Sequence, residues 1–360
     1  MLVFIALLFN IFATGILFEL TSRRSRTFSR DLEYIFILFL VVCYAFLVFN
    51  LGGRLGDDFL EYEYKYANIN SIDLDEGSPG FILLMRLVSS LVADSAPGIA
   101  LIIIMGQLIY LFSLRQLGDL KLPIFASLCF LFLFNRLIFE VSLNTIRSNL
   151  AFAISIGCVA VIFKKNQDTQ LHRLAIGILA GALLSYYFHP LSSIVFLGLM
   201  VIAGVLWSIN QKVIMLLALV FTTYFFLIIG NKFGFSEEFH WIGLALLENK
   251  IVGTMRENVN ITFSLWAQVT TFITLPVIAA EMNSINSRQN LLRSSARAGM
   301  LLTFISLLLS SELAIRVCYL TIPIAITYLL STASGQYRRV VLVLIAMASM
   351  FGSINLISEL

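Results

Sequence analysis

The sequence predicts an all-α protein: a polytopic integral membrane helical bundle of about twelve transmembrane helices, forming a single membrane domain over residues 1–360. Three observations predict this fold class. Of the 360 residues, 59% are apolar and 12% are charged, whereas a soluble globular domain has about 45–50% apolar and about 25% charged residues. Apolar runs recur along the whole chain, each near the ~20 residues that cross a bilayer. Lysine and arginine gather in alternate connections between these runs.

The composition also excludes several classes of protein: a soluble enzyme, a disordered chain and a disulfide scaffold. The net charge of +3 is too small to indicate nucleic-acid binding. The four cysteines lie within apolar runs without a pairing pattern, so neither a disulfide nor a zinc site is expected. The sequence has no P-loop, GxSxG or CxxC pattern, and only three histidines. We therefore expect no metal and no cofactor.

The predicted spans follow from run length, because helices that are apolar all round show no useful periodicity. The first run has no basic start and no small-residue cleavage site, so it is interpreted as a retained span and not a signal peptide. The predicted spans are 2–20, 34–51, 98–114, 122–140, 147–163, 174–189, 191–207, 213–230, 262–280, 298–312, 317–331 and 340–357.

The basic residues predict which connections face the cytoplasm. They lie at 23–30, 115–121, 164–173, 212, 288–297 and 338–339. Counting the apolar stretch 80–93 as a crossing would place the 288–297 group outside. That stretch has only 14 residues, with Arg86 in the middle, so we predict an interfacial or re-entrant helix there.

Two connections on the predicted outer side are long, at about 52–97 and 231–261. The first carries seven acidic residues and four aromatic residues before Phe81. The second contains the apolar stretch FHWIGLALLENKIVG, which could lie along the membrane surface. Loops of this length in a compact bundle are usually functional, so a site is expected on the outer face.

Five ionisable residues near the predicted membrane surface are functional candidates, because charge at this depth is costly. They are Glu140, Arg147, His189, Glu312 and Arg316, and the topology places all five on the outer side.

Structural interpretations of these residues stay open. Glu312 and Arg316 have the i, i+4 spacing of a helix ion pair, and Arg147 could extend to lipid headgroups. His189, next to Pro190, could be a structural hydrogen-bonding residue. Asp57 could be a solvated loop acid, as could Asp73 and Asp75, whose spacing otherwise suggests a weak metal site.

Arginines at a membrane surface fit a substrate that carries phosphates there, because the guanidinium fork matches phosphate oxygens. A lipid pyrophosphate with an attached sugar is such a substrate. Glycosyl transfer from it requires a base for the acceptor hydroxyl and positive charge for the leaving pyrophosphate. The residue types present supply both without a metal or a nucleotide.

Four stretches in order resemble the EpsG/Wzy group of bacterial polysaccharide polymerases over nearly the whole chain. The first is the outer loop with Asp57, Tyr62 and Tyr66 that leads to EGSPGF at 76–81. The others are IRSNLA at 146–151, FHPLSS at 188–193, and Arg316-Val-Cys-Tyr319.

The resemblance implies an O-antigen or exopolysaccharide polymerase of the bacterial cytoplasmic (inner) membrane, with its active site facing the periplasm or exterior. Its donor and acceptor would be undecaprenyl-pyrophosphate-linked oligosaccharides. A chain-length regulator and an upstream flippase would be its partners.

We assign residue roles as hypotheses. Arg147 and Arg316 would bind the donor pyrophosphate, and Arg54 the second lipid pyrophosphate. His189, or failing that Asp57 or Glu312, would take the acceptor proton. The remaining expected substrate-binding residues are Tyr62, Tyr66, Glu76, Asn144 and Tyr319.

Two other functions fit some of these features. A flippase or transporter of lipid-linked oligosaccharide would also be a large helical bundle, but it usually has polar residues near the midplane and two related halves. A membrane acyltransferase could use His189 as its base, but it would need an acyl donor, and the first two spans contain no histidine.

Overall fold

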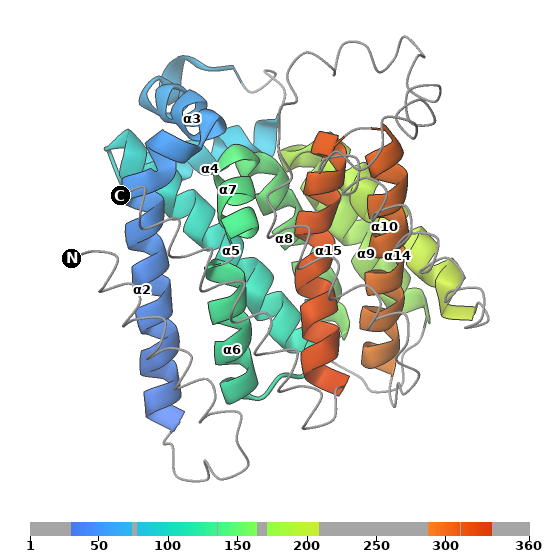
Figure 1. Ribbon diagram of the computed structural model, residues 1–360. Helices are drawn as coiled ribbons and strands as arrows, with labels where there is room; N and C mark the ends of the chain where they lie inside the picture. Colours follow the sequence, from blue (N-terminus) through green and yellow to red (C-terminus); the bar gives the residue numbers. More distant parts are fainter. Residues whose placement is uncertain are drawn as a thin grey trace, which may run out of the picture. The chain divides into compact units, whose positions relative to one another are not determined.

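A computed structural model describes residues 30–73, 78–134, 136–163, 171–208, 287–309 and 311–332 (Figure 1). Every regular element in these ranges is a helix, so an all-helical fold is confirmed for the described part of the chain. The helices are α2 (Arg30–Leu55), α3 (Asp57–Ala67), the 3₁₀ turn η1 (Ile69–Ser71), α4 (Pro79–Ser89), α5 (Ser95–Gly118), α6 (Leu122–Leu133), α7 (Arg136–Asn144), α8 (Ile146–Phe163), α9 (Leu171–Phe188), α10 (Pro190–Ser208), α14 (Ser287–Leu309) and α15 (Ser311–Thr332).

These helices form two compact units. The first contains α2 to α9 and the start of α10, up to Gly198. The second contains the rest of α10, α14 and α15 as far as Tyr328. The prediction of a single membrane domain stays a prediction.

The core of the first unit is built on α5 and α8, and α9 packs on the other side of α8. Glycines make the α8–α9 contact close. A Cβ at Gly181 would lie 2.8 Å from the Ser155 carbonyl oxygen, and one at Gly177 would lie 3.3 Å from the Cα of Val159. Small residues let apolar helices approach in this way when both lie in a membrane.

The predicted span 122–140 is divided into α6 and α7, which corrects the expectation of one continuous run. Contacts with α2 hold α7 in place. The Tyr44 hydroxyl lies 3.1 Å from Ser142 Oγ, and the Tyr44 ring meets the Phe139 ring edge-on, with centroids 5.8 Å apart. Run length alone could not reveal these tertiary contacts.

Among the described residues, two helices are long and apolar enough to cross a membrane, Tyr34–Leu55 and Ser95–Gly118. Shorter apolar helices occur at Ile146–Ile162, Arg173–Phe188, Pro190–Leu206 and Thr321–Ser331. The predicted spans 2–20, 213–230, 262–280 and 340–357 lie outside the described residues, so the number twelve stays a prediction. The second long predicted loop, 231–261, also lies outside them.

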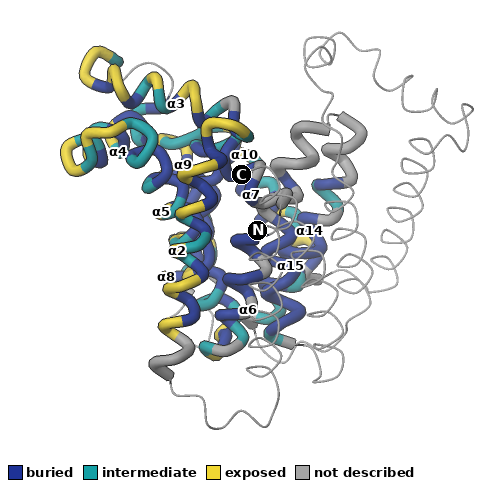
Figure 2. Tube along the Cα trace, turned by 60° about the vertical axis from the view of Figure 1, so that its left-hand side comes forward, coloured by how far each residue is buried: buried dark blue, intermediate teal, exposed yellow. Residues whose placement is uncertain are grey.

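Short helices cover one end of the first unit. The chain turns from α2 into α3 at Gly56, where a Cβ would lie 2.9 Å from the Leu143 Cβ. α3 and α4 then lie together at the end of the unit where α2 finishes (Figure 1). Both carry exposed positions on their outer sides, whereas α5 is buried along much of its length (Figure 2).

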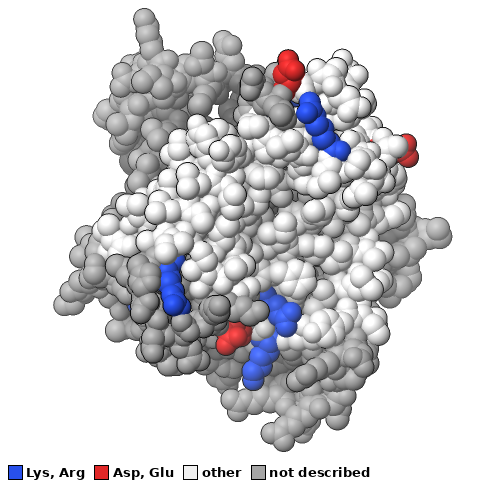
Figure 3. Space-filling view, turned by 180° about the vertical axis from the view of Figure 1, so that it is seen from behind, with Lys and Arg blue, Asp and Glu red and all other residues white. Residues whose placement is uncertain are grey.

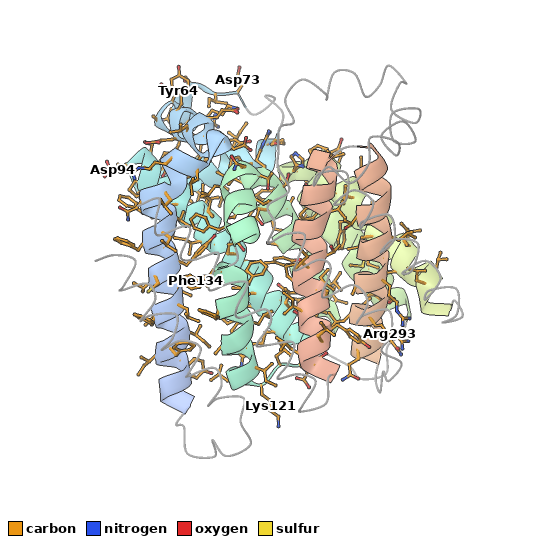
Figure 4. All side chains as sticks on the ribbon, viewed as in Figure 1. Tyr64, Asp73, Asp94, Lys121, Phe134 and Arg293 are labelled. Atoms are coloured by element: carbon orange, nitrogen blue, oxygen red, sulfur yellow. The ribbon has the colours of Figure 1, made fainter. Side chains whose placement is uncertain are left out.

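The two ends of the first unit differ in charge. Tyr64, Asp73 and Asp94 lie at the α3–α4 end, and Lys121 lies at the opposite end (Figure 4). Figure 3 shows one face on which few of the described side chains are charged.

At the end opposite α3 and α4, α5 closes with Asp119 in a left-handed conformation, φ 49°. The Leu120 amide donates to the Arg115 carbonyl at 3.0 Å, which satisfies one of the last carbonyls of the helix.

In the second unit, α14 begins before the predicted span 298–312 and includes the polar start of the helix. Arg297 is buried there, at 5% exposure. The Arg293 guanidinium donates to Asn290 Oδ1 at 2.9 Å.

Candidate functional site

Arg147 stands at the centre of a group of side chains at the α3–α4 end of the first unit. It is the second residue of α8, whose start is marked by the Asn149 amide donating to the Thr145 carbonyl at 2.9 Å. Its Nη1 donates to Ser78 Oγ at 3.2 Å. Its guanidinium carbon lies 5.4 Å from the centroid of the Tyr62 ring.

This position is electrostatically costly for an arginine, because the start of a helix is the positive end of its dipole. The Tyr62 ring offsets part of that cost through a cation–π interaction. The Ser78 hydroxyl offsets more by accepting a hydrogen bond. Positive charge held beside a helix start suits an anionic ligand.

Tyr62 is itself fixed by its surroundings and is only 3% exposed. Its ring meets Phe81 of α4 at 5.0 Å, with an interplanar angle of 67°. Lys65 Nζ lies 5.3 Å from the ring centroid and pairs with Glu61. Burial raises the pKa of Tyr62, while the charge of Arg147 acts in the opposite direction. The phenol therefore stays neutral near pH 7.

His189 lies between α9 and α10 and caps the start of α10. Its Nδ1 accepts the Ser192 backbone N–H at 3.2 Å and lies 2.6 Å from Ser192 Oγ. Its carbonyl accepts the Ser193 amide at 3.2 Å. Pro190 follows at the first helical position, where proline is favoured. His189 thus occupies an N-cap position, with a ring nitrogen in place of the usual side-chain oxygen.

The contact with the Ser192 backbone favours one tautomer of His189. A backbone N–H can only donate, so in this contact Nδ1 is the acceptor. In the neutral ring the proton is therefore on Nε2, an assignment from the hydrogen-bond network. In this state Nε2 is a donor.

Two contacts bring Arg147 and His189 to the same part of the unit. Ser148, which follows Arg147, has its Oγ 3.3 Å from His189 Nδ1. The N-terminus of α4 packs against the end of α9, since a Cβ at Gly80 would lie 3.1 Å from the Tyr187 carbonyl oxygen. We call Tyr62, Ser78, Arg147, Ser148, His189 and Ser192 the Arg147 cluster.

Other predicted site residues in the first unit make structural contacts. The Tyr66 hydroxyl donates to the Val92 carbonyl at 2.6 Å, and its ring fills the space beside Gly98. Asn144 Nδ2 donates to the Leu55 carbonyl at 3.1 Å and ties α7 to the end of α2. Arg54 is exposed on the last turn of α2. Their assignment to substrate binding stays a prediction.

The remaining predicted residues are described in part or not at all. Asp57 lies in α3, and Glu312, Arg316 and Tyr319 lie in α15, but their side chains are outside the description, as is that of Glu140. Glu76 lies outside the described residues altogether.

Three serines of the cluster were missed by the sequence analysis: Ser78, Ser148 and Ser192. A signal existed for Ser78, because Ser-Pro before an apolar run is typical of a helix start. A similar signal existed at His189-Pro190. Among the described residues, no group of three or more His, Cys, Asp or Glu is placed to hold a metal ion.

The fold and the cluster together define a class: a helical membrane protein with a cationic and aromatic site suited to an anionic substrate. The sequence profile of the EpsG family matches residues 34–359. The chain therefore belongs to the EpsG family, the family of Wzy/EpsG-type polysaccharide polymerases. Comparison with curated proteins and with solved structures gave no match.

Proposed function

We propose that the chain is a glycosyltransferase that polymerises undecaprenyl-pyrophosphate-linked oligosaccharide units at the outer face of the bacterial cytoplasmic membrane. Family membership supports a membrane polysaccharide polymerase. The observation that carries the finer proposal is the placement of Arg147 at a helix start, held by Ser78 and the Tyr62 ring.

The reaction breaks one bond and forms another. An acceptor hydroxyl oxygen attacks the anomeric carbon of the donor glycan, and the bond from that carbon to the donor pyrophosphate breaks. Undecaprenyl pyrophosphate leaves with the bonding electron pair, and a base takes the hydroxyl proton. The reaction as written requires neither metal nor nucleotide.

Arg147 would stabilise the leaving pyrophosphate. Its Nη1 is oriented by Ser78, and its guanidinium is held over a buried ring. A hydrogen-bond donor that is oriented before the reaction stabilises the negative charge that develops on the leaving group better than a mobile one does. Arg316 and Arg54 remain candidates for the other phosphates.

His189 would serve as a donor and not as the base in the capped state. Its Nδ1 accepts the Ser192 amide, so Nε2 carries the proton and could donate to a phosphate or sugar oxygen. Proton removal from the acceptor then falls to a carboxylate, for which Asp57 and Glu312 are the candidates.

Purified protein in liposomes tests the proposal, supplied with lipid-linked repeat units and with no ATP, nucleotide sugar or ion gradient. A ladder of glycan oligomers on a gel is the expected result. Units that cross the bilayer without lengthening would overturn it in favour of a transporter. Units linked through a monophosphate are the matched control, and they should react far more slowly if the pyrophosphate is recognised.

The proposal implies two partners that act on the same substrate. A flippase would bring the units to the outer face, and a chain-length regulator would set the extent of the polymer.

A further inference from the structure

α4 is a short helix with two unlike faces. Its buried face consists of Phe81, Ile82, Met85 and Val88, each at most 4% exposed. On the other side Leu83 is 53% exposed and Leu87 is 62% exposed. Leu91, in the turn that follows, is 77% exposed. A spacing of four residues places these three leucines in one stripe along the helix.

The length of α4 excludes a crossing. Its 11 residues extend about 16 Å at 1.5 Å per residue, whereas the hydrocarbon core of a bilayer is about 30 Å thick. Two polar side chains of α4 and its C-cap donate hydrogen bonds within the protein, although Arg86 Nε is buried without a hydrogen-bond partner among the described residues. Arg86 Nη2 donates to the Ile72 carbonyl at 2.6 Å, and Ser90 Oγ donates to the Leu87 carbonyl at 2.7 Å.

The leucine stripe adjoins another exposed apolar surface. Gly80, in the first turn of α4, lies against Tyr187 and Phe188 at the end of α9. On the last turns of α9, Leu183, Leu184 and Tyr187 are 67%, 51% and 57% exposed. α9 is an apolar helix of a family of membrane proteins, so its exposed apolar side chains are suited to lipid. The stripe on α4 extends that surface at the end of the unit.

We infer that α4 is an in-plane helix that inserts Leu83, Leu87 and Leu91 into the acyl region just below the lipid headgroups. Of the interfacial and re-entrant alternatives predicted for this stretch, this placement corresponds to the interfacial one. Because Ser78 at the start of α4 bonds Arg147, the depth of α4 determines the depth at which the Arg147 cluster meets lipid phosphates. The inference rests on the proposed function only in that last step.

Spin labelling of the full-length protein in liposomes tests the inference. Single cysteines at positions 83, 87 and 91 would carry a nitroxide, with the native cysteines replaced by alanine. The collision rate with oxygen, which partitions into lipid, is compared with that of a water-soluble nickel chelate. Position 64 is the matched control, since Tyr64 is 74% exposed on the neighbouring α3 and lies among the acidic residues Glu61 and Glu63.

The expected oxygen-to-nickel ratio is several-fold higher at 83, 87 and 91 than at 64. Nickel access at the three leucine positions equal to that at 64 would overturn the inference, because the stripe would face water. Exclusion of both reagents would also overturn it, because another part of the chain or a second copy would cover the stripe.

This measurement needs no catalysis, so it separates the two proposals. A high ratio in a protein that makes no glycan ladder would leave the in-plane helix standing and remove the polymerase. A glycan ladder together with low oxygen-to-nickel ratios would support the polymerase and overturn the in-plane helix.

Discussion

In the described part of the first unit, two arginines lie over aromatic rings, and their positions at opposite helix ends differ in electrostatic cost. Arg115 lies 5.0 Å from the Phe125 ring, in the last turn of α5. Arg147 lies 5.4 Å from the Tyr62 ring, in the first turn of α8. A cation is favoured at a helix C-terminus and disfavoured at an N-terminus. The helix dipole therefore stabilises Arg115 at the end of α5. At the start of α8 the dipole disfavours Arg147, and contacts with Ser78 and Tyr62 offset that cost.

The largest loss of polymer synthesis should come from substitution of Arg147, with Arg115 as the control. Arg147→Lys keeps the charge but loses the fork and the ring stacking, so we expect polymer synthesis in liposomes to fall about 100-fold. Arg115→Lys is the matched control and should retain near-normal synthesis. Equal synthesis by the two variants would remove the proposed role of Arg147.

The roles of the two His189 ring nitrogens, Nδ1 in the helix cap and Nε2 as a hydrogen-bond donor, can be separated by substitution. His189→Ala removes the cap of α10 and should cost about 1 kcal/mol of unfolding free energy. His189→Asn restores a capping oxygen but lacks the Nε2–H donor, so we expect stability near wild type with polymer yield still low. Thermal unfolding in detergent and gel analysis of glycan length measure the two outcomes. Full activity of His189→Asn would show that only the cap matters.

Substitution of the ring beside Arg147 should lower polymer synthesis more than substitution of the ring beside Arg115, but by less than Arg147→Lys does. Tyr62→Leu removes the cation–π contact and should lower synthesis about tenfold, given about 1–2 kcal/mol for such a contact when partly desolvated. Tyr62→Phe keeps the ring and loses only the hydrogen bond of the phenol with Arg147, so it should lose less synthesis than Tyr62→Leu. Phe125→Leu, at the other arginine, should lower only the melting temperature. An equal loss in Tyr62→Phe and Tyr62→Leu would point instead to the phenol hydroxyl.

The smallest effect should come from the hydroxyl that orients Arg147. Ser78→Ala removes one part-buried hydrogen bond of 3.2 Å, for which about 1 kcal/mol is expected. Synthesis should fall about tenfold or less, with the loss confined to turnover of bound units. Ser113→Ala, in the middle of α5, also removes a buried hydroxyl and should leave turnover unchanged.

The sequence predicts individual helices well where apolar runs end at polar or helix-breaking residues. The predicted span 98–114 lies within α5, 147–163 nearly coincides with α8, and the short helix predicted at 80–93 corresponds to α4. The break between α6 and α7 could not be predicted in this way, because it lies within the predicted span 122–140.

Three members of the Arg147 cluster were predicted from the sequence: Arg147, His189 and Tyr62. Arg147 and His189 stand out as ionisable residues beside apolar runs. Their partners come from other helices, since Tyr62 lies in α3 and Ser78 before α4. Tyr62 lies buried beside Arg147, a contact that depends on tertiary packing and that spacing along the chain does not encode. Its predicted role in substrate binding stays a prediction.

The contact between Tyr66 and Gly98 has a consequence for how relatives of this chain can vary. The Tyr66 ring occupies the space into which any side chain at position 98 would extend. At the same time its hydroxyl holds the Val92 carbonyl just before α5. A larger residue at 98 is therefore compatible with this packing only if position 66 becomes smaller. Across the family, the two positions should change together, in evolutionary steps that neither could take alone.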